Sequence, residues 1–170
     1  MAGKAAMSSM GADSLARALE LFDQVARKDG PLKWAARNEQ AAIERKLGKP
    51  QDALPLYEEV LKNSVPASLK REALCGKADI FLEMGATQSE NYQRAVELYD
   101  QLAADPKTPL HWRNQALFKK GVCLEKMNRR PKALATFYQV VEDDVRPDRS
   151  REFFWFYKAG FNEARLLEDD

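Results

Sequence analysis

One ten-residue pattern occurs four times in this chain of 170 residues, and it constrains the fold more than any other feature. In each copy an alanine is followed by an aromatic residue four positions later and by an aliphatic residue three positions beyond that. These steps place the three side chains on one face of a helix. The small alanine lets a neighbouring helix cross closely, and the aromatic ring fills the space beside the crossing. The four copies occupy residues 17–26, 52–61, 94–103 and 132–141.

Helices of a second type alternate with these copies. Each carries a small residue near its middle, and the segments 31–34 and 109–112, which precede two of them, have similar sequences. The motif alanines are 35, 42 and 38 residues apart. A period of this length, built from two helices, indicates a helical solenoid. Eight helices are expected, over residues 15–28, 32–47, 52–62, 67–84, from about 88, 110–127, 131 to 142–144, and 149–168.

An insertion precedes the third copy of the pattern. Met84 and Ala95 are 11 positions apart, whereas the matching stretches that begin at Leu47 and Met127 are six long. Within the insertion, residues 87–90 have the Thr-x-x-Glu form of a capping box. We therefore expect this helix to begin near residue 88, to be about one turn longer than its counterparts, and to project from one edge of the fold.

Polar residues and prolines mark the beginnings of several helices. Asp13 or Ser14 is expected to cap the first helix. Asp52 is expected to cap the third, because this places Pro55 in the first turn, where its missing N–H is not needed. Pro131 suits the first position of the seventh helix.

The composition narrows the classes of partner. The chain is 45% hydrophobic and 31% charged, and its formal net charge is +1. Such a balance gives no general attraction to nucleic acid or to an anionic membrane, and no apolar run is long enough to span a bilayer. Residues 1–14 make a poor secretory signal and are expected to form a flexible tail before a repeat domain over 15–170. The compartment is not fixed by these features.

Residues capable of catalysis or metal binding are sparse. Cys75 and Cys123 fall inside expected helices without metal-ligand spacing, which favours buried free thiols over a disulfide. The single histidine, His111, lies at a helix start, where a surface or packing role is expected. No phosphate-binding loop, catalytic triad or metal cluster is apparent. The sequence therefore predicts a non-catalytic protein without metal or cofactor.

With these repeats, the chain resembles the tetratricopeptide-repeat (TPR) family over residues 15–168. The resemblance implies an all-α, right-handed α-solenoid of about eight helices in antiparallel pairs. The repeats are about one to four residues longer than the usual 34, and related long-repeat solenoids share the same architecture. The resemblance rests on small residues in the first helix of each pair, namely Ala41, Ala78, Gly121 and Gly160. In the second helix it rests on Ala53, Ala95 and Ala133, followed by Tyr57, Tyr99 and Phe137.

The resemblance also implies a function. In this family the first helix of each pair lines a concave surface where a peptide or partner helix docks, so we expect a protein-interaction scaffold. Its partner should have a hydrophobic anchor for the C-terminal half and charge near Arg45 and Asp79. Some members clamp a C-terminal carboxylate with lysine, asparagine and arginine, and this clamp is largely missing here. Its sites hold Asn38 but also Ala42, Gly76, Gln115 and Lys119. The expected partner-binding residues are Asn38, Arg45, Asp79, Leu82, Phe118, Val122, Glu125, Phe154, Tyr157 and Phe161.

A second class of function stays open at this point. The first helix is of the motif type with no partner before it, and the last is of the other type with none after it. Either the chain is a segment of a longer protein, or its exposed ends mate in a homo-oligomer. The aromatic run 153–157 cannot face one direction on a helix, so part of it is core and part contacts a neighbour or a ligand. A structural spacer or oligomerisation segment is thus the alternative to a binding groove.

Overall fold

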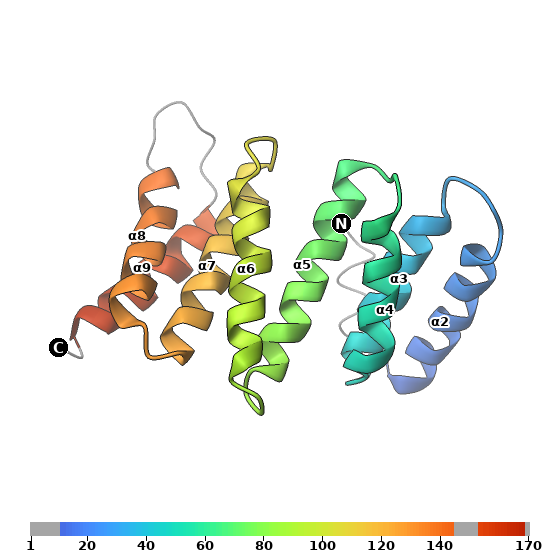
Figure 1. The fold of residues 1–170 in the computed structure, drawn as a ribbon, viewed down its shortest axis with the longest axis horizontal. Coiled ribbons are helices and arrows are strands. Elements are labelled where there is room, and N and C mark those ends of the chain that lie inside the picture. Colours follow the sequence, from blue (N-terminus) through green and yellow to red (C-terminus); the bar gives the residue numbers. More distant parts are fainter. Residues whose placement is uncertain (1–10, 145–152, 169–170) are drawn as a thin grey trace. The chain divides into compact units, whose positions relative to one another are not determined.

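A computed structural model describes residues 11–144 and 153–168, and these residues contain eight α-helices and no strand. The expected helices all occur, four of the motif type alternating with four of the other type (Figure 1). The parts of the expected tail and of the last helix that fall at residues 1–10 and 149–152 lie outside the described residues. The helices are α2 (Ala12–Ala26), α3 (Lys33–Lys46), α4 (Pro50–Lys62), α5 (Ala67–Met84), α6 (Glu90–Ala104), α7 (Leu110–Lys126), α8 (Arg130–Asp144) and α9 (Phe153–Glu168).

The chain divides into two compact units, residues 1–76 and 77–170. In the first unit α3 packs against both α2 and α4. In the second unit each helix from α6 to α9 packs against the next, and α7 also contacts α9 (Figure 1). Helices that are neighbours in sequence are therefore neighbours in space, as in a helical repeat.

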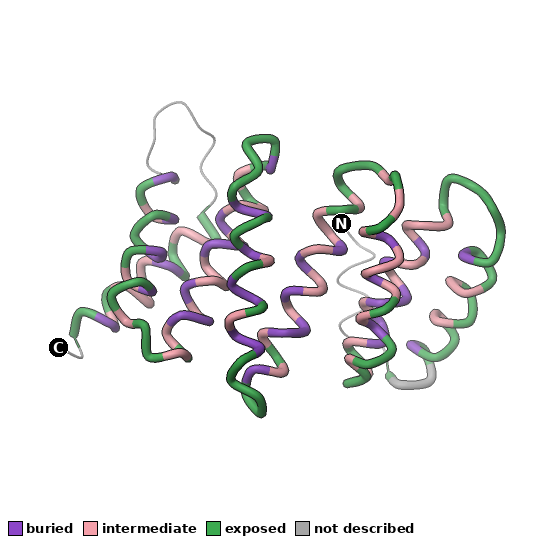
Figure 2. Tube along the Cα trace, in the orientation of Figure 1, coloured by how far each residue is buried: buried purple, intermediate pink, exposed green. Residues whose placement is uncertain are grey.

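The core of both units is built from the motif residues. Ala53, Ala95 and Ala133 are completely buried, and so are the rings of Tyr99 and Phe137. Figure 2 shows buried positions recurring at intervals along the helices. The expectation that small and aromatic residues meet inside the helix pairs is confirmed, because burial of these residues is what a 3.6-residue period predicts.

Two glycines allow close crossings. A β-carbon added at Gly121 of α7 would lie 2.5 Å from the Phe137 ring of α8, and one at Gly76 of α5 would lie 2.3 Å from the Tyr57 ring of α4. Both distances are far below van der Waals contact. Glycine at these positions therefore sets how closely the aromatic ring of one helix approaches the next.

Several helix beginnings differ from the sequence prediction, and α8 begins at Arg130, so that Pro131 takes its second position rather than its first. The N-cap of α2 is Gly11, so the helix begins at Ala12, and no side chain caps it. Likewise α4 begins at Pro50 rather than at Asp52, which puts Pro55 in the second turn of the helix. Pro50 takes the first position because its fixed φ suits a helix start. Pro55 is tolerated because it lies on the exposed side, where water can reach the backbone carbonyl that its missing N–H leaves unbonded.

The expected lengthening of the fifth helix is wrong. The helix that carries the third copy, α6, begins at Glu90 and has 15 residues, as many as α2 and α8. Thr87 does not cap it, because its hydroxyl donates instead to the Met84 carbonyl at the end of α5. The inserted residues thus lengthen the turn, and Tyr92 folds back over Gly85 at that turn.

Candidate functional site

In the second unit, α7 and α9 bring several aromatic rings together. Phe118 lies one turn before Gly121 on α7, and its ring centroid is 5.7 Å from that of Phe137. On the other side it is 5.4 Å from the Trp155 ring of α9. Phe154 meets Trp155 edge-to-face at 4.7 Å. Aromatic pairs at such separations attract one another beyond the area they bury, so the rings fix the packing of α9 on α7.

A lysine lies over this group of rings. The Nζ atom of Lys158 is 4.6 Å from the Phe154 ring centroid, 5.4 Å from that of Trp155 and 5.8 Å from that of Phe118. Lys158 follows Phe154 by one helical turn, so the same face of α9 presents both. Each cation–π contact contributes about 0.5–1 kcal/mol at an exposed site. The positive charge of Lys158 therefore lies over three aromatic rings.

Large apolar side chains continue along this side of α9. Phe154, Tyr157 and Phe161 are all exposed, the last two to 66% and 71%. Exposed apolar groups that adjoin one another, rather than isolated ones, are typical of interaction sites. We call Phe118, Phe154, Trp155, Tyr157, Lys158 and Phe161 the aromatic face.

Trp155 and Lys158 were not among the expected site residues. In the sequence Trp155 stands out only as part of the aromatic run 153–157, and Lys158 belongs to no distinguishing motif. The spacing of Phe154 and Lys158, four residues apart in a helix, was the signal available for the cation–π pair. The contact of Trp155 with Phe118 bridges two helices and has no local signal.

Two further predicted residues, Asp79 and Glu125, take part in internal ion pairs. The Oδ1 atom of Asp79 accepts hydrogen bonds from the Tyr99 hydroxyl and from Lys119 Nζ, both at 2.6 Å. The side chains of Asp79 and Lys119 are largely buried. Glu125 receives Arg165 Nη2 at 2.7 Å, which links α7 to α9. These carboxylates stabilise the packing of the second unit.

Cys123 lies beside the Asp79–Lys119 pair. Burial raises the pKa of its thiol to about 12, the negative charge of Asp79 adds to the increase, and a backbone hydrogen bond and Lys119 oppose it. Both cysteines are buried free thiols, as expected. Since the thiolate is the reactive form, Cys123 is an inert core residue at neutral pH.

The remaining predicted residues have mixed surroundings. Leu82 and Val122 are half-buried on α5 and α7. In the first unit Arg45 is half-buried, whereas Asn38 is buried and its Nδ2 donates to the Leu69 carbonyl at 3.0 Å. The structure therefore brings Phe118, with the exposed rings of α9, into one surface, and Asn38 serves mainly to hold α3 to the start of α5.

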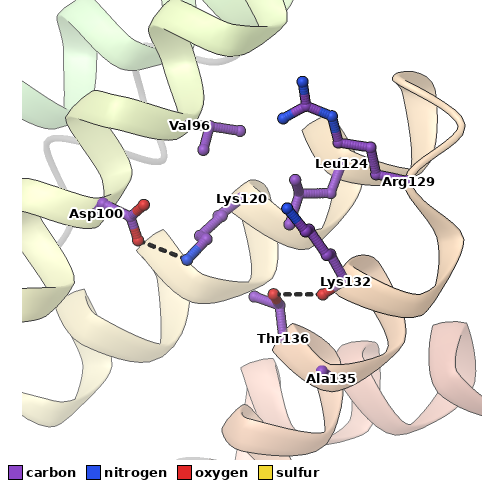
Figure 3. A pocket seen from close by; sticks show the side chains of 8 residues that line it. All are labelled: Val96, Asp100, Lys120, Leu124, Arg129, Lys132, Ala135 and Thr136. Carbon is purple, nitrogen blue, oxygen red and sulfur yellow. Dashed lines mark hydrogen bonds and ion pairs between the residues drawn. The ribbon is translucent and has the colours of Figure 1, made fainter.

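A shallow pocket of about 350 Å³ lies between α6, α7 and α8 (Figure 3). Three of its residues are basic, but Lys120 pairs with Asp100 at 2.5 Å, and Arg129 donates to Gln93 at 2.8 Å. Its charges are thus largely satisfied by the chain itself. Within the described ranges no group of three or more potential metal ligands occurs, and no helix is both long and apolar enough to cross a membrane.

The repeat pattern and its buried small residues agree with comparisons against known families. Models described as Tetratricopeptide repeat match residues 4–64, 39–89 and 115–144, more than half of the chain. The chain belongs to the tetratricopeptide repeat family. No curated protein and no solved structure matches it. Tetratricopeptide repeats form an all-α solenoid, are generally protein–protein interaction modules and are typically non-catalytic.

Proposed function

We propose that this TPR protein binds a peptide or partner helix on the aromatic face of its second unit. The observation that carries the proposal is the cluster of exposed rings on α9, continuous with Phe118 of α7 and overlaid by Lys158. Rings that are already packed against one another lose little conformational freedom when they bind. They are therefore good anchors for an apolar side chain of a partner.

The charge on this face favours an acidic partner. Lys158 is exposed and lies over rings, while the nearby Lys119 is occupied by Asp79. A carboxylate on the partner would meet Lys158, and neighbouring apolar residues would contact Phe154 and Phe161. This differs from the expectation of partner charges near Asp79, because the carboxylate of Asp79 already accepts two hydrogen bonds.

Selection of peptides from a random library displayed on phage tests the proposal. Enriched peptides should combine an aromatic or large aliphatic residue with an acidic one. Calorimetry should then show that Phe154→Ala and Phe161→Ala each weaken binding by about 2 kcal/mol, the scale of an interface hot spot. Lys158→Gln should weaken it less and should reduce its salt dependence.

Tyr138→Ala provides the control, because Tyr138 is an equally exposed aromatic residue on α8 outside the aromatic face. Its affinity for the selected peptides should match that of the unsubstituted chain. Peptides that bind the Phe154 and Phe161 variants as tightly as the unsubstituted chain would place the binding site elsewhere and refute the proposal.

A further inference from the structure

The small-residue site of α9 is open. In α7 the corresponding residue, Gly121, is covered by the Phe137 ring of α8. At Gly160 of α9, by contrast, an added β-carbon would have only Val141 within 4 Å among the described residues, at 3.9 Å. A helix that packed on α9 as α8 packs on α7 would bring an aromatic ring to Gly160.

Other positions of α9 show the same difference. Three residues of α7 that surround Gly121, namely Asn114, Leu117 and Leu124, are buried. The residues of α9 at the same sequence separations from Gly160 are exposed or half-buried. We call these residues, with the glycine, the open α9 face: Phe153, Phe156, Gly160 and Glu163.

The motif residues of α2 are open in a complementary way. Ala18 and Phe22 are half-buried, and Val25 is 37% exposed. In the other three copies the motif alanine is fully buried, and the aromatic and aliphatic residues of the motif are at most 4% exposed. We call Ala18, Phe22 and Val25 the open α2 face; it is the kind of surface that covers the small residue of a first helix.

We propose that the open α2 face of one copy packs against the open α9 face of a second copy. Phe22 of one copy would cover Gly160 of the other, as Phe137 covers Gly121 within the chain. The contact continues the interface that α7, α8 and α9 already form, since α9 would gain a following helix as α7 has one in α8. In this contact α9 of one copy and α2 of the other would pack as α7 and α8 pack within the chain.

The charges at the edge of this contact are complementary. In α6 and α8 the residue before the motif alanine lies near the residue three positions after the small residue of the preceding helix. Arg94 lies 5.6 Å from the Phe81 ring in this way, and Lys132 lines the same pocket as Leu124 (Figure 3). In the proposed contact these two positions hold Arg17 and Glu163. They have opposite charges, so the pairing would be attractive.

The two faces are different surfaces, which makes the contact heterologous. A copy that uses its α9 face still has its α2 face, so assembly can continue beyond two copies. This property separates the proposal from a symmetric dimer in which two α9 faces meet. The substitutions chosen below lie outside the aromatic face, but Phe153 stacks on Tyr157 of that face at 6.2 Å. Peptide binding is therefore compared with self-association in the α2 variants, whose substitutions lie in the first unit.

Two variants of the full chain test the proposal, each blocking one face with an exposed residue. Val25→Asp removes the α2 face and leaves the α9 face, whereas Phe153→Asp does the reverse. Sedimentation velocity over roughly 1 µM to 1 mM should show association of the unsubstituted chain and monomers for each variant alone. An equimolar mixture of the two should form a complex of one copy of each and no larger species. Tyr138→Asp, the control, should associate like the unsubstituted chain.

Exchanging the two charges gives a second test, which does not place a carboxylate in the apolar part of the contact. Arg17→Glu and Glu163→Arg should each weaken self-association roughly tenfold, and mixing the two variants should restore it, because each contact again pairs opposite charges. A monomeric unsubstituted chain over the whole concentration range would overturn the proposal. Self-association of Val25→Asp alone would overturn it in favour of a symmetric contact. Neither result would alter peptide binding at Phe154 and Phe161.

Discussion

At the scale of single residues, Gly121 and Gly160 occupy the same position in two repeats but have different surroundings. A β-carbon at Gly121 would collide with the buried ring of Phe137, whereas one at Gly160 would enter nearly open space. The ring cannot move aside easily, because it is completely buried. The same substitution should therefore have opposite effects at the two positions.

Gly121→Ala is expected to lower the free energy of unfolding by about 1–3 kcal/mol, because overpacking forces a shift of the Phe137 ring or of α8. Gly160→Ala is expected to raise it by about 0.5–1 kcal/mol, because alanine loses less backbone entropy than glycine in a helix. Urea unfolding of both variants at low concentration checks this pair. Equal effects of the two substitutions on the free energy of unfolding would mean that Gly121 does not limit how closely α7 and α8 cross.

Cys123 makes stability depend on alkaline pH. Burial raises the pKa of its thiol from the ordinary 9.0 to about 12 in the folded chain, with Asp79 adding to the shift. A group whose pKa is higher in the folded state stabilises that state fully below its unfolded pKa. The contribution is then lost at about 1.4 kcal/mol per pH unit as the pH rises from 9 toward 12.

The difference in unfolding free energy between the unsubstituted chain and Cys123→Ala should therefore be constant from pH 7 to about pH 9 and should shrink above it. Denaturant unfolding at several pH values measures this difference, and other alkaline titrations cancel because both proteins share them. A difference that stayed constant up to pH 10.5 or so would show that the folded thiol ionises normally.

At the scale of helices, α3 and α7 end in the same way. Gly48 has a φ of 72° and Asn128 a φ of 55°, both in the left-handed region. The following N–H groups bond back in parallel, from Lys49 to the Glu44 carbonyl and from Arg129 to the Leu124 carbonyl, both over 2.9–3.0 Å. A residue that tolerates positive φ is thus required where each first helix turns into the second.

Gly48→Ala should consequently lower the free energy of unfolding by about 1–2 kcal/mol, since an alanine in the left-handed region crowds its β-carbon against the backbone. Asn128→Gly should raise it by a few tenths to about 1 kcal/mol. Gly30→Ala is a suitable control, because Gly30 has neither a positive φ nor a neighbour within 4 Å of an added β-carbon. Thermal unfolding measures the stability of the three variants. A Gly48→Ala variant as stable as Gly30→Ala would contradict the prediction.

At the scale of the whole molecule, the contacts described here are mostly between helices that follow one another in sequence. Stability in such a protein is close to a sum over repeats and their interfaces with neighbours. A defect in one repeat should therefore remain local, and the two compact units should respond to it differently.

Hydrogen exchange of the Gly121→Ala variant can detect this. Backbone amides of α6 to α8 should lose protection by up to the full destabilisation, whereas those of α2 and α3 should lose much less. Equal loss throughout would indicate that the chain unfolds as a single cooperative unit, and the additive description would then be incorrect.

The sequence by itself determined the number and order of the helices and which residues lie inside the pairs. Ala95 and Gly121 are buried because a 3.6-residue period and small residues in step are local properties, which a sequence displays directly. The family resemblance, rather than the period, implied a surface position for Phe154, Tyr157 and Phe161, and these rings are exposed on α9. Reasoning from the local pattern failed at residues 87–90, because the hydroxyl of Thr87 has two helix ends within reach and only packing selects one.

Only the tertiary structure decided how the polar residues are used. The Asp79 carboxylate joins Tyr99, 20 positions away, and Lys119, 40 positions away, and nothing in the local pattern pairs them. The contact of Lys158 with Phe118 and the open site at Gly160 likewise depend on which helices are present beside α9. Periodicity determines the face of the helix on which a side chain lies. The residue that it contacts depends on how distant segments pack, and that packing depends on the interactions of the whole unit.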